Sequence, residues 1–343
     1  MQLFSCPGCG ARLFFDSLSC VACGEQVAAD PRASRMVPAG GAACDLRAAA
    51  GCNWSAARGD GTTPPQPERP EHGPPPRCLS CAMTRTIPDL AIDENVRHWQ
   101  QAEAAKRWVL WGLMRLGWFL PGDSGPRPVF DMIAEQTSGG PVQVTMGHAD
   151  GVITLNVSEA DPARVALRRA ELGEPYRSVM GHLRHEIAHY LFWRLSADAG
   201  FVAEFRARFG DERADYGAAL RAHYAAPRSP GETHITSYAT AHPHEDWAET
   251  AAHVLHLLDI AHSFDAAGLR LGRDDGWQAD AYGCIDPVAL IDRAGAIGLA
   301  LNHVNRAMGL ADLYPFVLPP EVRDKLQFAL RALHRGGGVP AGG

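Results

Sequence analysis

The sequence contains no long uninterrupted apolar run. Its most apolar stretch, 108–120, contains Arg115 and is shorter than the roughly 20 residues that a membrane-spanning helix needs. The first residues, 1–6, show neither the basic segment nor the apolar segment that together form a signal peptide. We therefore expect no membrane association and a cytoplasmic location.

The sequence also lacks an excess of positive charge. It holds 32 Lys and Arg against 39 Asp and Glu, which gives a net charge of -7. Binding to a phosphate backbone requires a basic face, so we expect no nucleic acid partner. The 343 residues, 46% of them hydrophobic, are enough for one ordinary domain and a smaller one.

Cysteine is nearly absent after residue 81, where only Cys284 occurs. The other eight cysteines precede it, and several form C-x-x-C pairs. In a chain without an export signal, such pairs more often bind a metal than form disulfides. Two pairs have the spacing of a zinc ribbon, which brings four thiolates to one ion: Cys6, Cys9, Cys20 and Cys23. The alternative, a redox pair, fits less well with the glycine-rich turns around them.

Four further cysteines predict a second structural zinc site: Cys44, Cys52, Cys78 and Cys81. The alternative is that they are buried free thiols, because only the last pair has the spacing of a metal knuckle. The run 59–77, rich in proline, glycine and charge, is then a flexible loop inside the site. Closed sites of this kind stabilise a fold, and they indicate a docking module for a protein partner.

The pattern changes near residue 87, so we expect a cysteine-rich domain over 1–86 and a second domain over 87–343. Short β-branched runs predict a hairpin from 141–146 and 151–157. Apolar periodicity and capping residues predict helices, including a short one opened by Asp161 and Pro162. The other predicted helices span 93–119, 174–195, 199–209, 211–226, 244–263, 286–308 and 320–335. This order indicates an α+β fold, mostly helical, with a small sheet before its central helix.

The central helix carries the sequence His185-Glu186-Ile187-Ala188-His189. Residues four apart share one face of a helix, so both imidazoles can bind one cation. Glu186 is then carried beside the metal, where a general base can take a proton from water. The alternative is a chance match in a chain with 15 histidines.

A catalytic zinc needs a third protein ligand and one open position. A histidine six residues beyond His189 is excluded, because Phe192 and Leu195 replace the required glycine and histidine. The remaining common solution is a glutamate on a second helix. Glu245 and Glu249 lie four apart there, so we favour Glu245 as the ligand and Glu249 as the acceptor of a ligand histidine's N–H. The reverse assignment stays open.

These motifs resemble the gluzincin peptidases, which include the catalytic domain of anthrax lethal factor. More closely, the chain resembles, almost end to end, a bacterial family of putative zinc-binding metallopeptidases that begin with a zinc ribbon. The stretches that carry this second resemblance are 6–10, 85–90, 151–156, 173–177, 181–190, 242–256 and 313–318.

The resemblance implies a zincin-like catalytic domain with one catalytic zinc beside one or two structural zinc ions. It also implies that Tyr238, seven residues before Glu245, assists the oxyanion. A tyrosine in a loop with no such role is the alternative. Independently, strand 152–156, if it forms an edge beside the cleft, can hold an extended peptide through Val152, Thr154 and Asn156.

Three functions follow as hypotheses. The first is a zinc metallopeptidase that acts on a peptide or protein substrate. The second is a non-enzymatic module in which zinc stabilises a protein-interaction surface. The third is a zinc hydrolase of non-peptide amides. An intact Glu186 between the two histidines favours an enzyme, but it does not separate the first function from the third.

Overall fold

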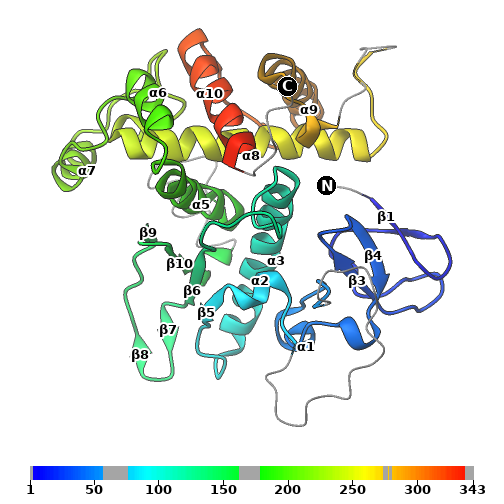
Figure 1. Cartoon of the computed structure of the whole chain (residues 1–343). Coiled ribbons are helices and arrows are strands. Elements are labelled where there is room, and N and C mark those ends of the chain that lie inside the picture. Colours follow the sequence, from blue (N-terminus) through cyan, green and yellow to red (C-terminus); the bar gives the residue numbers. More distant parts are fainter. Residues whose placement is uncertain (1–2, 57–75, 162–177, 273–276, 278–279, 337–343) are drawn as a thin grey trace. The chain divides into compact units, whose positions relative to one another are not determined.

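A computed structural model of the chain describes residues 3–56, 76–161, 178–272, 277 and 280–336 (Figure 1). It has the α+β architecture that the sequence predicts. The chain divides into two compact units. One contains residues 2–114 and 126–183, and the other contains residues 115–125 and 184–343. The loop predicted over 59–77 and the short helix predicted at Asp161 fall largely outside the described residues.

The cysteine-rich part of the first unit is built from small antiparallel pairs. Strand β1 (Phe4–Ser5) pairs with β2 (Arg12–Leu13), and β3 (Val27–Asp30) pairs with β4 (Arg35–Pro38). Two single-turn helices follow, α1 (Arg47–Ala50) and α2 (Leu79–Ala82). The rings of Phe4, Phe15 and Trp54 each meet Trp111 of the long helix α3 (Asp93–Arg115) edge to face, which supplies this part with an apolar core.

The first unit also contains a four-stranded sheet, whose strands lie in the order β5-β6-β10-β9. Its strands are β5 (Thr84–Thr86), β6 (Val129–Ile133), β9 (Gly147–Ala149) and β10 (Val152–Asn156). Strand β10 is parallel to β6 and antiparallel to β9. The predicted hairpin exists, but its first strand is 147–149 and not 141–146. Because β9 is an outer strand, 152–156 does not form the sheet edge on which its proposed role in peptide binding depends.

A fully buried ion pair lies between α3 and this sheet. Nζ of Lys106 is 2.9 Å from Oε2 of Glu103, and both side chains are completely buried. Thr84 of β5 donates its hydroxyl hydrogen to Glu103 at 2.6 Å. A buried charge is tolerated only while its partner remains.

We therefore expect Lys106→Ala to lower the free energy of unfolding by about 3–5 kcal/mol, because Glu103 would keep an uncompensated charge. The double variant Glu103→Leu/Lys106→Met removes both charges and should lie much closer to the wild type. Urea unfolding of the zinc-loaded proteins measures both values. A single variant as stable as the wild type would contradict this account of the ion pair.

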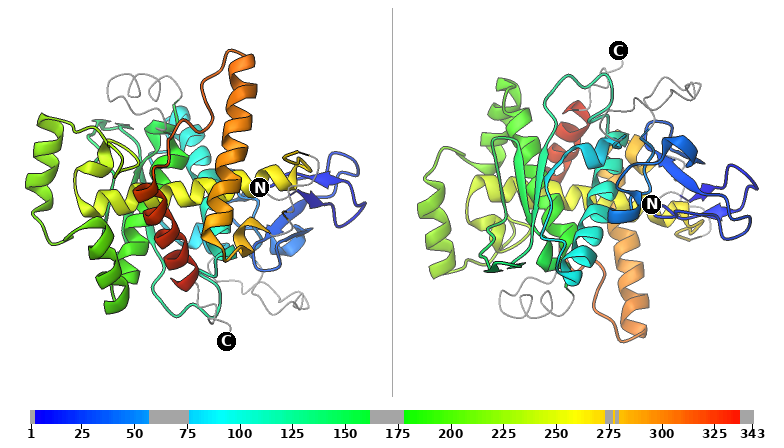
Figure 2. Two further views of the ribbon diagram at one scale, coloured as in Figure 1. Left: turned by 90° about the horizontal axis from the view of Figure 1, so that it is seen from above. Right: turned by 90° about the horizontal axis from the view of Figure 1, so that it is seen from below.

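The second unit is helical and is organised around α8 (Pro243–Ala266). Pro243 stands at its first turn and the side chain of His242 caps it. Figure 2 shows the orange α9 crossing the yellow α8 in both views. Helices α6 (Ala199–Phe209), α9 (Pro287–Ala307) and α10 (Pro320–Gly336) of this unit pack on α8.

An aromatic cluster fixes the packing of α6 and α10 on α8. The ring of Trp247 of α8 is fully buried and lies 5.3 Å from Phe201, 6.3 Å from Phe205 and 6.1 Å from Phe328. Its indole N–H donates to the carbonyl of Ala188 at 2.9 Å. This bond ties α8 to α5 (Val179–Leu195), the helix that carries the two histidines.

The helix ends agree with the predicted ranges to within a few residues wherever the structure describes them. Helix α7 (Tyr216–Ala225) starts five residues later than predicted, since Asp215 and not Asp211 caps it. Among the described helices, none is both long enough and apolar enough to cross a membrane.

Candidate metal centre

Helices α5 and α8 bring three potential metal ligands together. His185 and His189 lie one turn apart on α5, and their Nε2 atoms are 3.1 Å from each other. Oε2 of Glu245, in the first turn of α8, lies 3.0 Å from Nε2 of His185 and 3.5 Å from Nε2 of His189. The structure thus joins the three residues that the sequence proposes as ligands.

These distances fit a zinc ion. Ligands about 2.1 Å from a tetrahedral zinc lie about 3.4 Å from one another, close to all three separations. Oε2 of Glu245 is also buried without a hydrogen-bond partner among the described residues. A buried carboxylate oxygen is costly unless a cation or a donor satisfies it. Two imidazoles and one carboxylate are a donor set that zinc prefers.

The electrostatics of the cluster favour positive charge. Burial lowers the pKa of His185, but Glu245 and Glu249 outweigh it and raise that pKa well above its usual value. Burial raises the pKa of Glu245, yet the nearby charge of His189 and contact with His185 hold it well below its usual value. Both shifts arise because carboxylates surround the imidazoles, and a divalent cation is stabilised by the same arrangement.

Glu249 approaches His185 from the side away from the metal ligands. Its Oε1 lies 2.7 Å from Nδ1 of His185, and its Oε2 accepts a hydrogen bond from the hydroxyl of Thr236 at 2.8 Å. A carboxylate on Nδ1 fixes the ring tautomer and directs Nε2 towards a metal. The geometry therefore gives Glu245 and Glu249 different contacts.

Glu186 and Tyr238 lie in the same region. Glu186 is mostly buried, and its Oε2 has no hydrogen-bond partner among the described residues. A carboxylate of this kind is free to accept a proton. The ring of Tyr238 lies 5.8 Å from that of His185, and burial raises the pKa of its phenol, which therefore keeps its proton at neutral pH.

Tyr216 also contacts the cluster, and no sequence pattern predicted it. Its hydroxyl donates to Oε1 of Glu245 at 2.6 Å. Burial and the charge of Glu245 raise the pKa of the phenol. Tyr216 lies in the long insert between His189 and Glu245 and has no motif spacing to either, so no sequence signal identifies it.

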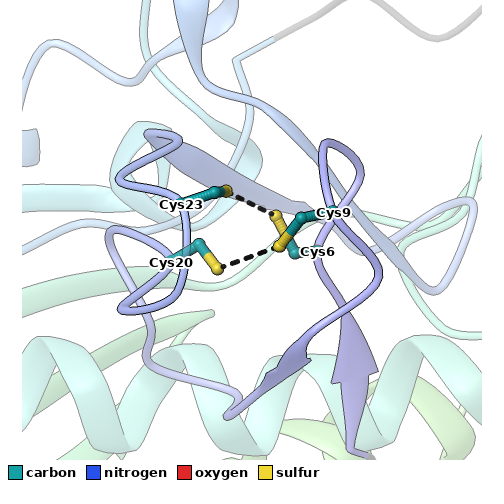
Figure 3. A group of neighbouring side chains, drawn as sticks. All are labelled: Cys6, Cys9, Cys20 and Cys23. Carbon is teal, nitrogen blue, oxygen red and sulfur yellow. Dashed lines mark hydrogen bonds between the residues drawn. The ribbon is translucent and has the colours of Figure 1, made fainter.

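The predicted zinc ribbon forms a compact group of four thiols (Figure 3). Sγ of Cys6 lies 3.7 Å from that of Cys23, and Sγ of Cys9 lies 3.7 Å from that of Cys20. Thiolates about 2.3 Å from a tetrahedral zinc are about 3.8 Å apart, whereas a disulfide requires about 2.0 Å.

Two matching turns build this group. The amide of Gly10 donates to the carbonyl of Cys6 at 2.9 Å, and that of Gly24 donates to Cys20 at 2.8 Å. Gly10 and Gly24 have φ of 77° and 79°, a conformation that a residue with a side chain rarely adopts. Each C-x-x-C pair is thus turned towards the other pair.

The other four predicted cysteines also converge. Sγ of Cys52 lies 3.5 Å from those of Cys78 and Cys81, and all four thiols are nearly fully buried. The amide of Cys78 donates to Sγ of Cys44, and that of Cys81 donates to Sγ of Cys78, each at 3.4 Å. Amide donors of this kind stabilise thiolates.

The predicted substrate-binding residues Val152, Thr154 and Asn156 belong to the first compact unit, and the histidines belong to the second. The side-chain amide of Asn156 makes hydrogen bonds within its own unit. It donates to Glu135 at 2.7 Å and accepts from the amide of Ser158 at 3.0 Å. The role of these residues in substrate binding stays a prediction.

Comparison with known proteins gives two family matches. The model of a family described as "Putative zinc-binding metallo-peptidase" matches residues 95–332, and that of a zinc-ribbon domain matches residues 3–42. Uncharacterized proteins of Mycobacterium tuberculosis and Mycobacterium bovis are 36% identical to the chain over 335 residues, which cover 96% of this chain and 94% of theirs. No solved structure matches the chain significantly.

Proposed function

The chain belongs to the family of putative zinc-binding metallopeptidases, and on this premise we propose that it is a gluzincin-type zinc peptidase. One observation carries the proposal. Nε2 of His185, Nε2 of His189 and Oε2 of Glu245 converge, and the carboxylate of Glu186 beside them keeps an oxygen that no described residue hydrogen-bonds. Three protein ligands and an adjacent general base are the parts that zinc-assisted hydrolysis requires.

His185, His189 and Glu245 would hold the catalytic zinc. When bound, zinc lowers the pKa of a water molecule and polarises a substrate carbonyl. Glu186 takes the proton of the attacking water and passes it to the leaving nitrogen. Tyr238 donates a hydrogen bond to the oxygen that gains negative charge.

Peptide bonds are the proposed substrate, and this choice depends on the family. A protein or peptide would enter as an extended segment, for which strand addition to a sheet edge is the common mode of binding. Strand β10 lies between β6 and β9, so a peptide cannot add to β10 as an edge strand.

The cysteine clusters would hold two structural zinc ions, which gives three per chain. Arg107 supports this count for the second cluster. It is buried and donates to the carbonyl of Gly51 at 3.2 Å, next to Cys52, while its Nε and Nη1 have no partner among the described residues. A guanidinium there compensates the double negative charge of a zinc ion with four thiolates. The ribbon would also dock a protein partner.

We expect mass spectrometric metal analysis to find three zinc ions per chain. Cys52→Ser should bind two, because it removes one ligand of the second cluster. The matched control is Cys284→Ser, which alters a buried cysteine outside both clusters and should retain three. A Cys52→Ser protein that still binds three would remove the second cluster as a metal site.

A peptide-library digest tests the proposed activity. The zinc-loaded protein should cleave library peptides, and the same protein stripped of its catalytic zinc should not. A parallel panel of acylated amines, which contain amide bonds but no peptide bonds, tests for hydrolysis of non-peptide amides. Hydrolysis confined to that panel would replace the peptidase with a non-peptide amidase. A zinc-loaded protein that hydrolyses neither would support an interaction module.

A further inference from the structure

The hydrogen bond from Tyr216 gives the two carboxylate oxygens of Glu245 different partners. Oε1 accepts the phenol hydrogen at 2.6 Å, while Oε2 lies 3.0 and 3.5 Å from the two Nε2 atoms. We infer that Tyr216 is a positioning residue that holds Glu245 as a one-oxygen ligand of the zinc. This inference depends on the zinc centre of the proposed function.

Three contacts fix the start of the helix that carries the tyrosine. It is the first residue of α7, whose N-terminus is capped by the side chain of Asp215 through the amide of Ala218. Its ring meets the imidazole of His242 edge to face at 5.2 Å. Nε2 of His242 lies 3.1 Å from the carbonyl of Ala214, two residues before Tyr216. Since His242 also caps α8, the start of α7 is tied to the start of the helix that carries Glu245.

The consequence concerns the number of atoms bound to the metal. A carboxylate can bind zinc through one oxygen or through both. If both oxygens of Glu245 bound, the centre would already have four protein donors and no open position in a tetrahedral site. By holding Oε1, Tyr216 leaves Oε2 as the only donor of Glu245. One position then stays free for water or substrate.

The fixed carboxylate should also bind metal more tightly. Glu245 is completely buried, so an oxygen that lost the phenol would find no water to replace it. Outer partners of metal ligands typically contribute about 10- to 100-fold in metal affinity. The ring of Tyr216 is 43% exposed, so loss of its hydroxyl alone should leave the packing intact.

Tyr216→Phe tests the inference, with Tyr224→Phe as the matched control. Tyr224 lies on the same helix and is 64% exposed, and its ring meets those of His223 and Tyr238, which are not metal ligands. Chelator competition on proteins whose cysteine sites stay loaded gives the zinc affinity of the catalytic site. We expect Tyr216→Phe to lose about 10- to 100-fold and Tyr224→Phe to match the wild type.

Cobalt placed in the catalytic site, with zinc retained by the cysteines, provides a second readout. Cobalt absorption is strong in four-coordinate sites and weaker at higher coordination. Tyr216→Phe should therefore show weaker bands than the wild type, because Oε1 becomes free to bind.

Unchanged affinity and an unchanged cobalt spectrum in Tyr216→Phe would overturn the inference while leaving the zinc centre intact. Failure of the wild type to bind metal at His185 and His189 would instead overturn the proposed function. Neither readout requires turnover, so the two failures are distinguishable.

Discussion

Glu186→Gln should lower the rate of peptide hydrolysis by about 10²- to 10⁴-fold, the usual contribution of a general base. Glutamine matches glutamate in shape, so the helix and the neighbouring histidines should keep their places. It cannot take a proton at neutral pH. Because Glu186 is not one of the three converging ligands, we expect the variant to retain its zinc.

Turnover and zinc content have to be measured on the same preparation. Glu232→Gln is the matched control, since Glu232 is an exposed glutamate that does not belong to the ligand set. It should hydrolyse peptides at the wild-type rate. Retained turnover in Glu186→Gln would remove this residue as the base, and loss of zinc would show that it supports the metal instead.

The second large effect concerns the two glutamates of α8. Glu245→Ala should lose the catalytic zinc almost completely, because Oε2 is one of the three donors that converge in the described part of the chain. Glu249→Ala should lose only about 10- to 100-fold in zinc affinity. Its carboxylate contacts Nδ1 of His185, so its loss frees the ring to change its tautomer and orientation.

Chelator competition at constant pH ranks the two variants, and the cysteine sites supply an internal reference that neither change should affect. Thr236→Val should weaken zinc binding less than Glu249→Ala does, because it leaves the carboxylate of Glu249 in place. The hydroxyl of Thr236 donates to Oε2 of Glu249 and accepts from the amide of Ala239. If Glu249→Ala lost zinc more completely than Glu245→Ala, the two assignments would have to be exchanged.

Local sequence signals predicted most of the fold. Capping residues and prolines act within a few residues, and most helix ranges followed from such local signals, as at Asp93, where α3 begins. At α7 the predicted start at 211 was wrong, because Asp215 caps that helix. Strand pairing depends on distant segments, and here the prediction failed. The run 152–156 joins β6, which lies about 20 residues earlier in the chain, so it became an inner strand.

The residues of the candidate site also fall into two groups, those that local sequence spacing predicts and those that only the fold brings together. His185 and His189 are related by helical spacing, and Glu245 and Glu249 are related likewise, so each pair could be read from the sequence. Tyr216 reaches Glu245 only because the insert folds back on α8, and Thr236 reaches Glu249 through the loop before that helix. Contacts made by such irregular segments carry no periodic signal.

The two cysteine clusters also differ in how far local sequence predicts them. The turns at Gly10 and Gly24 follow from the repeated C-x-x-C-G pattern. The second cluster joins Cys52 to Cys78 across residues that include 57–75, which lie outside the described part of the chain. Its spacing is irregular, and only the three-dimensional arrangement brings its thiols to metal-binding distance.

The central claim is that His185, His189 and Glu245 hold a zinc ion. Anomalous diffraction at the zinc absorption edge, from crystals grown with zinc, locates every bound zinc ion directly. We predict a peak about 2 Å from Nε2 of each histidine and from Oε2 of Glu245, in addition to one peak in each cysteine cluster. Peaks at the cysteines with none between the histidines would contradict the claim.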